Sequence, residues 1–467
     1  MEYFVGNEST PIRFVDLFAG LGGFHVGLSK VRGIKTKCVF ASEINEQLLE
    51  AYKKNFPGLR PSSYAGDITA VSAEQIGKHE ILCAGFPCQP FSKAGYQEGF
   101  ACERNGNLFG DHLLRVIKHH TPPLLLLENV PNLLKHDNGD TFETIKKLLK
   151  QEGYSVREKL ISPHEFGIPQ IRRRLYIVAS RVGKRLENFS WPKPNGEQPS
   201  IYDILESKRT KGLQIPHHMV EAIEIWNEFL RKFPPDRGLP GFPIWGMEFG
   251  ATYPFENSTP MTCRINTLHA SRGSFGRCLK GMNREESLLQ IPTYAREKTF
   301  PSWKQNFIRH NRNLYESNKG WIQGWMKQLC DLHPSHQKLE WNCGWEERDI
   351  WKHVISFRPS GIRVKKTDFA PALVTISTQV PIIGKYKRFM STRECAALQG
   401  LEKLKHLPDS PAQISRALGN AVNAEIVSKI VTQLLKASPA PTTLRHAKVS
   451  PMPKEDTLRQ QMLSCIG

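Results

Sequence analysis

Residues 13–18 (RFVDLF) form an apolar, strand-like run that leads directly into a glycine-rich turn. The turn, residues 19–24 (AGLGGF), is followed by an amphipathic stretch that predicts a helix. A strand, a glycine turn and a helix in this order open a nucleotide-binding βα unit, because glycines let the backbone approach a ligand closely. The spacing departs from G-x-G-x-x-G, so the turn is weak evidence by itself.

A second strand-like run, residues 37–41 (KCVFA), ends in Ser42 and Glu43. An acidic residue about 20 positions past the glycine turn is placed to hold ribose hydroxyls. The alternative for Glu43 is a solvated position near the start of a helix. Residues 66–68 (GDI) follow what we expect to be a third strand edge.

Cys88 lies on a Gly/Pro-rich turn just after the apolar run of residues 81–84 (ILCA). Open α/β sheets build their sites at the carboxyl ends of strands, where this cysteine is presented. A thiolate there is a strong nucleophile whose pKa is tuned locally. A turn cysteine without a role is the alternative.

Residues 122–130 (PPLLLLENV) predict a strand buried on both faces that ends at Glu128. A partly desolvated carboxyl at that edge has a raised pKa and can act as an acid. Farther along, residues 167–178 alternate polar and apolar side chains into another strand. Arg172 and Arg174 point to one side of that strand and need anionic or carbonyl partners, or else they form a solvated face.

The chain resembles the DNA (cytosine-5-)-methyltransferases of bacterial restriction-modification systems. The resemblance rests on an ordered series of motifs within residues 12–180 and about 385–430: FVDLFAGLGGF, GFPCQPFS, LLLENV, QIRRR, RECAALQGL and LGNAV. Each motif is weak alone, but the ordered series is highly specific. It implies an α/β fold, in which a doubly wound Rossmann-like, S-adenosylmethionine-dependent domain carries a separate, inserted target-recognition domain.

The resemblance implies a reaction in which the thiolate of Cys88 adds to carbon 6 of cytosine and activates carbon 5 for methylation. Glu128 would hydrogen-bond ring N3, and Arg174 would contact the cytosine carbonyl, with Arg172 assigned to the same catalytic group. The target base must leave the helix stack so that the thiol reaches its ring face.

The resemblance also implies a pocket for S-adenosyl-L-methionine around the glycine turn. Glu43 would bind the ribose and residues 67–68 the adenine, while the late LGNAV segment would complete the pocket. The expected cofactor-binding residues are Phe18, Gly20, Leu21, Gly22, Gly23, Glu43, Ile44, Asp67, Ile68, Pro87, Leu108, Asn420 and Val422.

Three regions are candidates for DNA contact. Residues 92–107 resemble the loop that closes over the flipped base, although an ordinary surface loop is the alternative. Residues 262–284 are basic and polar, which suits groove contacts or phosphate contacts alone. Residues 310–313 are a weaker candidate. The expected DNA-binding residues are Gln89, Ser92, Lys93, Arg264, Arg272 and Arg277.

Tryptophan marks a change of domain, because all 9 tryptophans lie between Trp191 and Trp351. We expect a catalytic domain at 1–190, a target-recognition domain at 191–384, a return to the catalytic domain at 385–435 and a disordered tail at 436–467. Ala372 stands where the family often has the threonine of a Thr-Leu pair, which leaves the nearby contacts open.

The 64 Lys and Arg against 45 Asp and Glu give a net charge of +19, which points to double-stranded DNA or another polyanion. We see no apolar run of about 20 residues and no signal peptide, so we expect a cytoplasmic protein without membrane contact, active at the nucleoid. The 10 cysteines lack C-x-x-C pairs, so neither zinc nor disulfides are expected. The family implies a monomer and a cognate restriction endonuclease, which need not form a complex with it.

Three alternatives remain open. A tRNA methyltransferase of the same family would carry a Cys-Phe-Thr signature, which is absent from the sequence. A DNA-binding regulator with a decayed site would be expected to lose Cys88 first. A nicotinamide-dependent oxidoreductase would explain only the glycine turn.

Overall fold

The computed structural model of the chain describes residues 10–87, 108–183, 185–206 and 214–437. Its larger sheet has the strand order β3-β2-β1-β4-β5-β7-β6, and only β7 runs against its neighbours. The strands are β1 (Ile12–Leu17), β2 (Thr36–Ser42), β3 (Tyr64–Ala65), β4 (Ile81–Ala84), β5 (Leu124–Asn129), β6 (Ser155–Ile161) and β7 (Arg174–Ser180).

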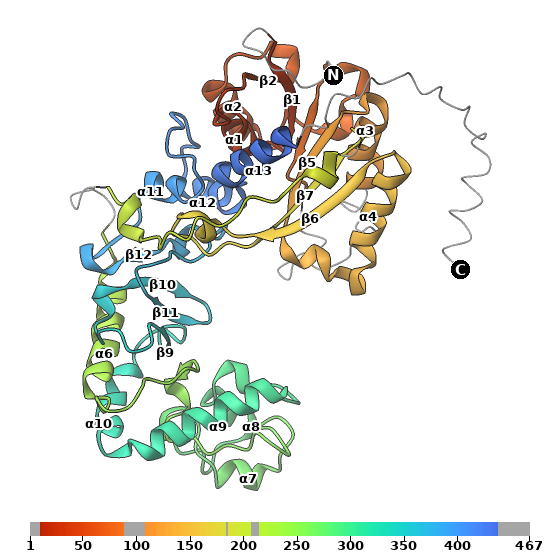
Figure 1. The fold of residues 1–467 in the computed structure, drawn as a ribbon. Coiled ribbons are helices and arrows are strands. Elements are labelled where there is room, and N and C mark those ends of the chain that lie inside the picture. The colour runs from red at the N-terminus through yellow and green to blue at the C-terminus, as the bar shows by residue number, and fades with distance from the viewer. Residues whose placement is uncertain (1–9, 88–107, 184, 207–213, 438–467) are drawn as a thin grey trace, which may run out of the picture.

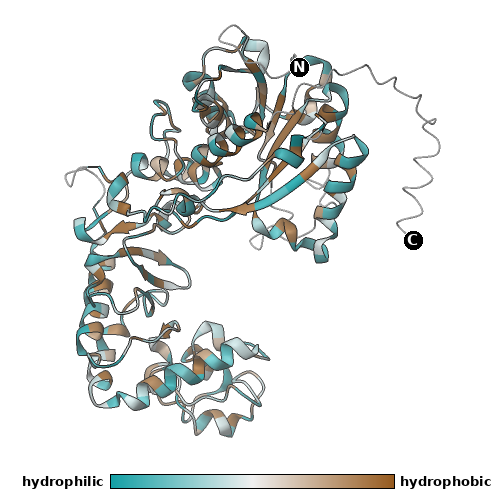
Figure 2. Ribbon diagram, in the orientation of Figure 1, coloured by the Kyte–Doolittle hydropathy of each residue, from teal (hydrophilic) through white to brown (hydrophobic). Residues whose placement is uncertain are grey.

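Helices cover both faces of this sheet, as a doubly wound α/β fold requires (Figure 1). One core packs α1 and α13 on the sheet, and the other packs α3 and α4 on the opposite face. Figure 2 shows apolar strands enclosed by helices whose outward sides are hydrophilic. The helices are α1 (Gly23–Ser29), α2 (Glu46–Asn55), α3 (Leu114–His120), α4 (Asp140–Gln151), α5 (Arg185–Asn188) and α13 (Ala424–Lys436).

The contact between α1 and α13 is close because glycine occupies it. A β carbon at Gly27 would lie 2.4 Å from Cγ1 of Val427. The last described helix of the chain therefore packs on the first, although almost the whole sequence separates them.

A second sheet has the order β13-β12-β10-β11-β9-β8. Helices α6 (His217–Lys232) and α10 (Lys319–Leu329) pack on one of its faces. Its strands are β8 (Ile244–Trp245), β9 (Lys338–Asn342), β10 (Val354–Arg358), β11 (Gly361–Lys365), β12 (Ile382–Ile383) and β13 (Arg388–Phe389). Helices α11 (Thr392–Ala397) and α12 (Pro411–Asn420) lie between the two sheets (Figure 1).

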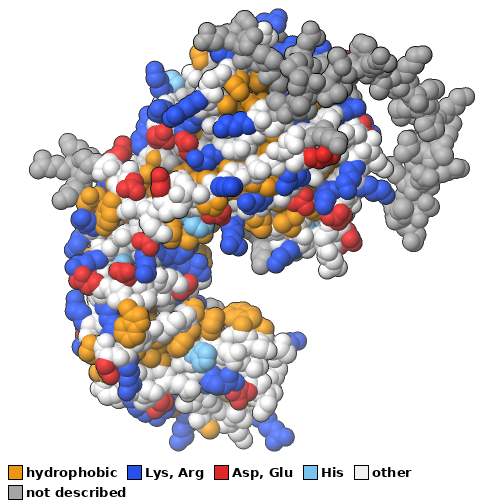
Figure 3. Space-filling model, viewed as in Figure 1, with side chains coloured by type: hydrophobic (Ala, Val, Ile, Leu, Met, Phe, Trp, Pro, Cys, Tyr) orange, Lys and Arg blue, Asp and Glu red, His pale blue; other side chains and the backbone are white. Residues whose placement is uncertain are grey.

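A small helical lobe ends the molecule on the side away from the large sheet. It contains α7 (Ile265–His269), α8 (Arg284–Leu289) and α9 (Ser302–Ser317) around a core of its own. The whole molecule forms an arc, and Figure 3 shows an open hollow on its inner side. No helix among the described residues has the length and apolar content needed to cross a membrane.

Candidate active site

Three neighbouring strands, β1, β4 and β5, end at the same edge of the large sheet. Leu17 of β1 pairs with Ala84 of β4, and Ala84 pairs with Leu127 of β5. The strand order changes direction between β1 and β4, which is where open α/β sheets form a ligand crevice. The glycine turn, the residues before Cys88 and Glu128 therefore meet at this crevice.

The turn after β1 has an unusual backbone. Phe18, Gly20 and Gly22 have φ values of 57°, 55° and 83°, in the left-handed region that few non-glycine residues adopt. The Gly22 N–H donates to the Ala19 carbonyl at 2.8 Å, and the Gly20 N–H donates to Oε2 of Glu43 at 2.9 Å. These bonds hold the turn against the end of β2.

The glycines of the turn have different purposes. A β carbon at Gly22 would lie 2.5 Å from the Phe56 ring, and one at Gly23 would lie 2.3 Å from the Val422 carbonyl oxygen. By contrast, apart from Gly20 and its two chain neighbours, no atom of the described residues lies within 4 Å of a β carbon built at Gly20. Gly22 and Gly23 thus allow close packing, whereas Gly20 borders open space.

Glu43 presents a carboxylate beside this open space. Its Oε1 accepts the Asn45 N–H at 2.9 Å, while Oε2 is held by Gly20. Burial raises the pKa of Glu43, and the two N–H donors act against that shift. The neighbouring Ile44 is 70% exposed, which is unusual for a large apolar side chain. A carboxylate next to an apolar surface suits a ligand that combines a sugar with an aromatic base.

Three other residues predicted for the cofactor pocket, Asp67, Ile68 and Leu21, differ in how their side chains lie. Asp67 is exposed, and its Oδ1 accepts the Thr69 N–H at 2.8 Å. Ile68 is only 4% exposed and its carbonyl accepts a hydrogen bond from Arg115 at 3.3 Å. The side chains of Ile68 and Leu21 belong to hydrophobic cores, so these two residues offer backbone rather than side chain to a ligand.

The crevice continues to the boundary of the described residues. Pro87 is half-buried at the end of the segment that follows β4, and Leu108 begins a π-helical turn, Leu108–Leu113. The predicted residues Cys88, Gln89, Ser92 and Lys93, with the whole of the expected closing loop at residues 92–107, lie outside the described residues.

Glu128 is a buried carboxyl at the same edge, with 7% of its surface exposed. Its Oε1 lies 3.1 Å from Nε of Arg174. Its Oε2 lies 3.7 Å from the position of a β carbon on Gly85, three residues before Cys88. Burial raises the pKa of Glu128, against the opposing positive charges of Arg174 and Arg172. The site thus favours a carboxyl group that keeps its proton to a higher pH than usual.

Asn129 is a site residue that the sequence analysis did not identify. It is 2% exposed, and its Nδ2 donates to the Phe86 carbonyl at 3.4 Å. The Phe86 ring packs against Phe109, with ring centroids 5.5 Å apart. Asn129 therefore positions the chain that leads to Cys88. Its signal in the sequence is a polar side chain that closes an otherwise apolar strand.

Arg172 differs from its predicted catalytic placement. Its guanidinium is buried, and Nη2 donates to the carbonyls of Gly419 at 2.7 Å and Ala421 at 3.2 Å. Nη1 donates to the Leu373 carbonyl at 3.4 Å. Arg172 therefore joins the end of α12 and a loop of the second sheet to this edge of the large sheet, which is a positioning role.

The segment after α12 closes the crevice from the other side. The Val422 carbonyl lies against Gly23, and its Cγ2 lies 3.3 Å from the position of a β carbon on Gly85. Asn420 is exposed at the end of α12. The structure therefore brings Val422 to the glycine turn and to the start of the cysteine segment together.

A buried polar group lies beneath the glycine turn and was also missed. Asp16 of β1 is 0% exposed and accepts a hydrogen bond from the Tyr52 hydroxyl at 3.3 Å. That hydroxyl lies 2.8 Å from Nδ1 of His25. Burial raises the pKa of Asp16 to about 8 and lowers that of His25 to about 4. An aspartate within an apolar strand was the available signal.

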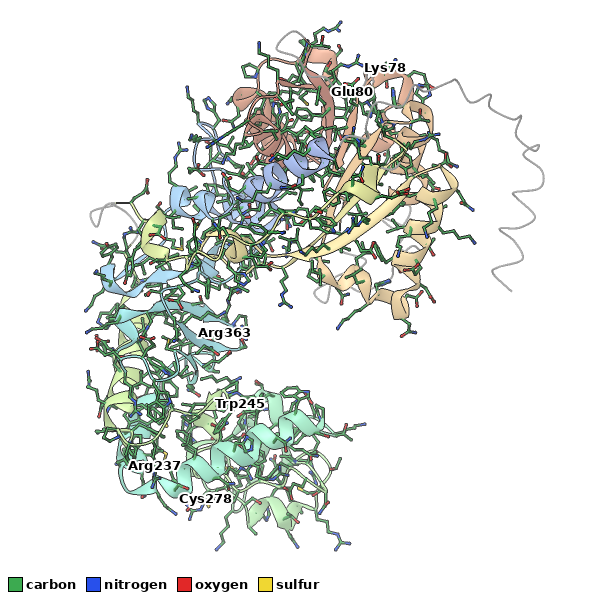
Figure 4. The ribbon with its side chains drawn as sticks, viewed as in Figure 1. Lys78, Glu80, Arg237, Trp245, Cys278 and Arg363 are labelled. Carbon is green, nitrogen blue, oxygen red and sulfur yellow. The ribbon has the colours of Figure 1, made fainter. Side chains whose placement is uncertain are left out.

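The predicted DNA-contacting arginines of the helical lobe lie far from the hollow. Arg264 precedes α7 at the end of the molecule farthest from the large sheet (Figure 1). Arg272 forms an isolated antiparallel β-bridge with Cys278, and Cys278 lies on the outer side of the arc (Figure 4). Arg277 precedes Cys278 and donates to Gln290 at 3.3 Å. The structure does not bring these arginines to the hollow, and their DNA contact stays a prediction.

The weaker candidate at residues 310–313 is wrong for two of its members. Asn311 is 0% exposed, and its Oδ1 accepts the Trp245 N–H at 2.7 Å. Arg312 pairs with the fully buried Glu248 at 3.1 Å, and its guanidinium lies 4.3 Å from the centre of the Tyr253 ring. These polar residues hold the helical lobe together.

Comparison with known proteins finds a family model, the C-5 cytosine-specific DNA methylase, that matches residues 12–233. The Type II methyltransferase M.AluI of Cellulosimicrobium cellulans is 29% identical over 514 aligned positions, which cover 94% of this chain and 96% of that enzyme. The similarity to M.AluI thus extends through the second sheet and the helical lobe.

Other relatives match over less of their length. The Type II methyltransferase M.HhaI of Haemophilus parahaemolyticus is 41% identical over 42% of this chain and 58% of that enzyme. M.MspI of a Moraxella species is 42% identical over 46% of this chain and 49% of that enzyme. The match therefore spans about half the length of each of these two enzymes.

Proposed function

Because the chain belongs to the C-5 cytosine-specific DNA methylases, we propose that it methylates carbon 5 of cytosine within a specific short sequence of double-stranded DNA. The observation that carries this proposal is the position of Glu128. Its buried carboxyl lies beside Gly85, at the start of the segment that leads to Cys88. A nucleophilic thiol and a carboxyl acid at one sheet edge are the groups that activation of a cytosine ring requires.

The methyl donor that we propose is S-adenosyl-L-methionine, which supplies an electrophilic sulfonium methyl group. The residues at the crevice fit this molecule. Gly20 leaves room for close approach of the ligand, and the Glu43 carboxylate is placed to accept hydrogen bonds from ribose hydroxyls. Ile44 provides an apolar surface for the adenine.

In the proposed reaction, the target cytosine leaves the DNA stack and enters the crevice. The Cys88 thiolate forms a bond to carbon 6 while Glu128, whose pKa is raised by burial, donates a hydrogen bond from its protonated form to ring N3. Carbon 5 gains nucleophilic character and takes the methyl group. A water molecule acting as base would then take the carbon 5 proton, and the electron pair of that C–H bond forms the carbon 5–carbon 6 double bond as Cys88 leaves carbon 6 as a thiolate.

Arg174 completes this group of side chains. Its guanidinium is partly exposed and already lies 3.1 Å from Glu128. We propose that it contacts the cytosine carbonyl and offsets the negative charge that develops there. Arg172 acts through its clamp on residues 419–421, without touching the base.

The DNA duplex would lie in the hollow of the arc. The net charge of +19 favours a polyanion, and Lys and Arg side chains border the hollow on its upper side in Figure 3. Methylation of a short site would protect DNA from a restriction endonuclease with the same specificity. Plasmid from cells that make this chain should then resist that endonuclease, while plasmid from control cells is cut.

The test is transfer of a radiolabelled methyl group from S-adenosylmethionine to duplex DNA and, separately, to tRNA. We expect label in 5-methylcytosine of DNA for the wild type and none for Cys88→Ser. Glu128→Gln should lower kcat by about 100-fold or more, because it removes the acid.

Cys278→Ser is the matched control, because Cys278 is an exposed thiol on the outer side of the arc. It should retain wild-type activity. Label that appears in tRNA alone would contradict the DNA assignment, and full activity of Cys88→Ser would contradict the covalent step.

A further inference from the structure

The second sheet has one covered face and one basic face. Leu339, Trp341, Ile355, Ile362 and Val364 point into the core beneath α6 and α10. Because side chains alternate along a strand, the residues between them point to the opposite face. In β9, β10 and β11 that opposite face carries Lys338, Glu340, Asn342, Val354, Ser356, Arg358, Gly361, Arg363 and Lys365, of which Val354 and Ser356 are buried.

The strand register brings three cations of this face together. Arg358 pairs with Gly361 and Ser356 pairs with Arg363 across the β10–β11 hairpin. Lys365 lies two residues beyond Arg363 on β11, on the same face. We call Arg358, Arg363 and Lys365 the basic cluster.

The basic cluster has little negative charge to balance it. Glu340 is the only acidic residue in β9, β10 and β11, and its Oε2 lies 2.8 Å from Nε of Arg363. Arg358 donates to a neutral partner, Oε1 of Gln379, at 2.7 Å. Its buried Nε has no hydrogen-bond partner among the described residues.

The cluster is therefore electrostatically unfavourable in the free protein. Burial lowers the pKa of Arg358, and repulsion by Arg363 lowers it further. Burial also lowers the pKa of Lys365, and repulsion by Arg363 lowers it further. The charge of Glu340 raises it but does not reverse the shift. Like charges held together at partly desolvated positions destabilise a fold unless an anion joins them.

The basic cluster faces the hollow of the arc. Figure 4 shows Arg363 and Trp245 on the inner side of the arc, with Arg237 and Cys278 on its outer side. At the end of the sheet that holds Arg358, a cavity of about 730 Å³ is lined in part by Lys338, His333 and Arg358. The lining of this cavity also includes the acidic residues Glu221 and Asp331.

We propose that Arg358, Arg363 and Lys365 bind the phosphate backbone of the DNA duplex that occupies the hollow. This inference rests on the proposed function. The three side chains are half-buried on a sheet face, so they project too little to enter a groove and read base edges. Phosphate contacts of this kind fix the register of a duplex without reading its sequence. The cluster would therefore set how deep the target strand lies against the catalytic edge.

The experiment measures binding of a fluorescent duplex of scrambled sequence over a range of salt concentrations. Each lost phosphate contact lowers the slope of log K against log salt by about 0.9. We expect that decrease for Arg363→Gln and for Lys365→Gln, and about twice that decrease for the double variant. Arg237→Gln, an exposed arginine on the outer side, should keep the wild-type slope.

Thermal unfolding without DNA separates a binding role from a structural one. Removal of Lys365 relieves repulsion, so Lys365→Gln should unfold at the wild-type temperature or above it. Wild-type salt slopes in both single variants would overturn the proposal. A lowered unfolding temperature with an unchanged slope would also overturn it, because the cluster would then be structural. Absence of duplex binding by the wild type would refute the proposed function and this inference together.

Discussion

At the scale of single residues, the proposed site contains buried carboxyl groups for which burial disfavours the charged form. Glu128, Glu43 and Asp16 are carboxyls whose pKa is raised by burial near the carboxyl ends of neighbouring strands. Such groups are uncommon in cores because desolvation penalises the charged form. Their concentration at one edge of the sheet supports the proposed active site there.

Asp16 predicts a measurable pH dependence of stability. Its pKa is about 8 in the folded chain and about 3.9 when unfolded, so the folded form retains a proton that the unfolded form has lost. Its contribution to stability is complete below the unfolded value and is lost as pH rises toward 8. The loss is up to about 1.4 kcal/mol per pH unit.

Three histidines, His79 buried and His25 and His336 half-buried, change stability with pH in the opposite direction and at lower pH. His25, His79 and His336 each have a pKa lowered to about 4, so they add stability as pH rises to about 6.5. The window from pH 6.5 to 8 lies above the histidine transitions, and comparison with Asp16→Asn separates the contribution of Asp16 from those of Glu43 and Glu128. In thermal unfolding, the wild type should lose stability across this window, whereas Asp16→Asn should lose less. An exposed control, Asp409→Asn, should follow the wild type, and parallel curves for Asp16→Asn would contradict the argument.

At the scale of elements, the catalytic sheet was predictable because its signals are local. Apolar runs predicted strands at residues 13–18, 37–41, 81–84 and 122–130, and the structure has strands at each of these places. Glu128 ends such a run, so its place at the sheet edge followed from the strand pattern alone. The clamp made by Arg172 was not predictable, because its carbonyl partners lie more than 200 residues away along the chain.

The hydrogen bonds of Arg172 join the end of α12 to the large sheet, and their contribution can be tested by substitution. One lysine ammonium cannot reproduce the bonds that its guanidinium makes to three carbonyls. Arg172→Lys should therefore lower stability by about 2–3 kcal/mol. It should also raise the KM for S-adenosylmethionine more than it lowers kcat, because the held segment borders the proposed cofactor site.

Arg173→Lys is the matched control for this clamp, because Arg173 is exposed and adjacent in sequence. It should leave the unfolding temperature and both kinetic constants unchanged. If Arg172→Lys instead kept the wild-type KM and lowered kcat, the result would favour a catalytic contact between Arg172 and the target cytosine.

At the scale of the whole molecule, the arc separates two tasks. The large sheet carries the residues that we propose for catalysis, and the second sheet turns a basic face toward the hollow (Figures 1 and 4). The distribution of tryptophan indicated a second domain from Trp191 onward. It did not indicate which Lys and Arg side chains of that domain lie on the same face of a sheet. That information comes from pairing between β9, β10 and β11, which a charge count cannot supply. The sequence analysis therefore selected the arginines of residues 262–284 and missed the basic cluster.

The measurement that tests the central claim most directly is methylation sequencing of plasmid DNA from cells that express this chain. We predict 5-methylcytosine at one cytosine of a single short motif, and none in cells that express soluble Cys88→Ser. Unmethylated plasmid from cells with soluble, well-expressed wild-type protein would contradict the account.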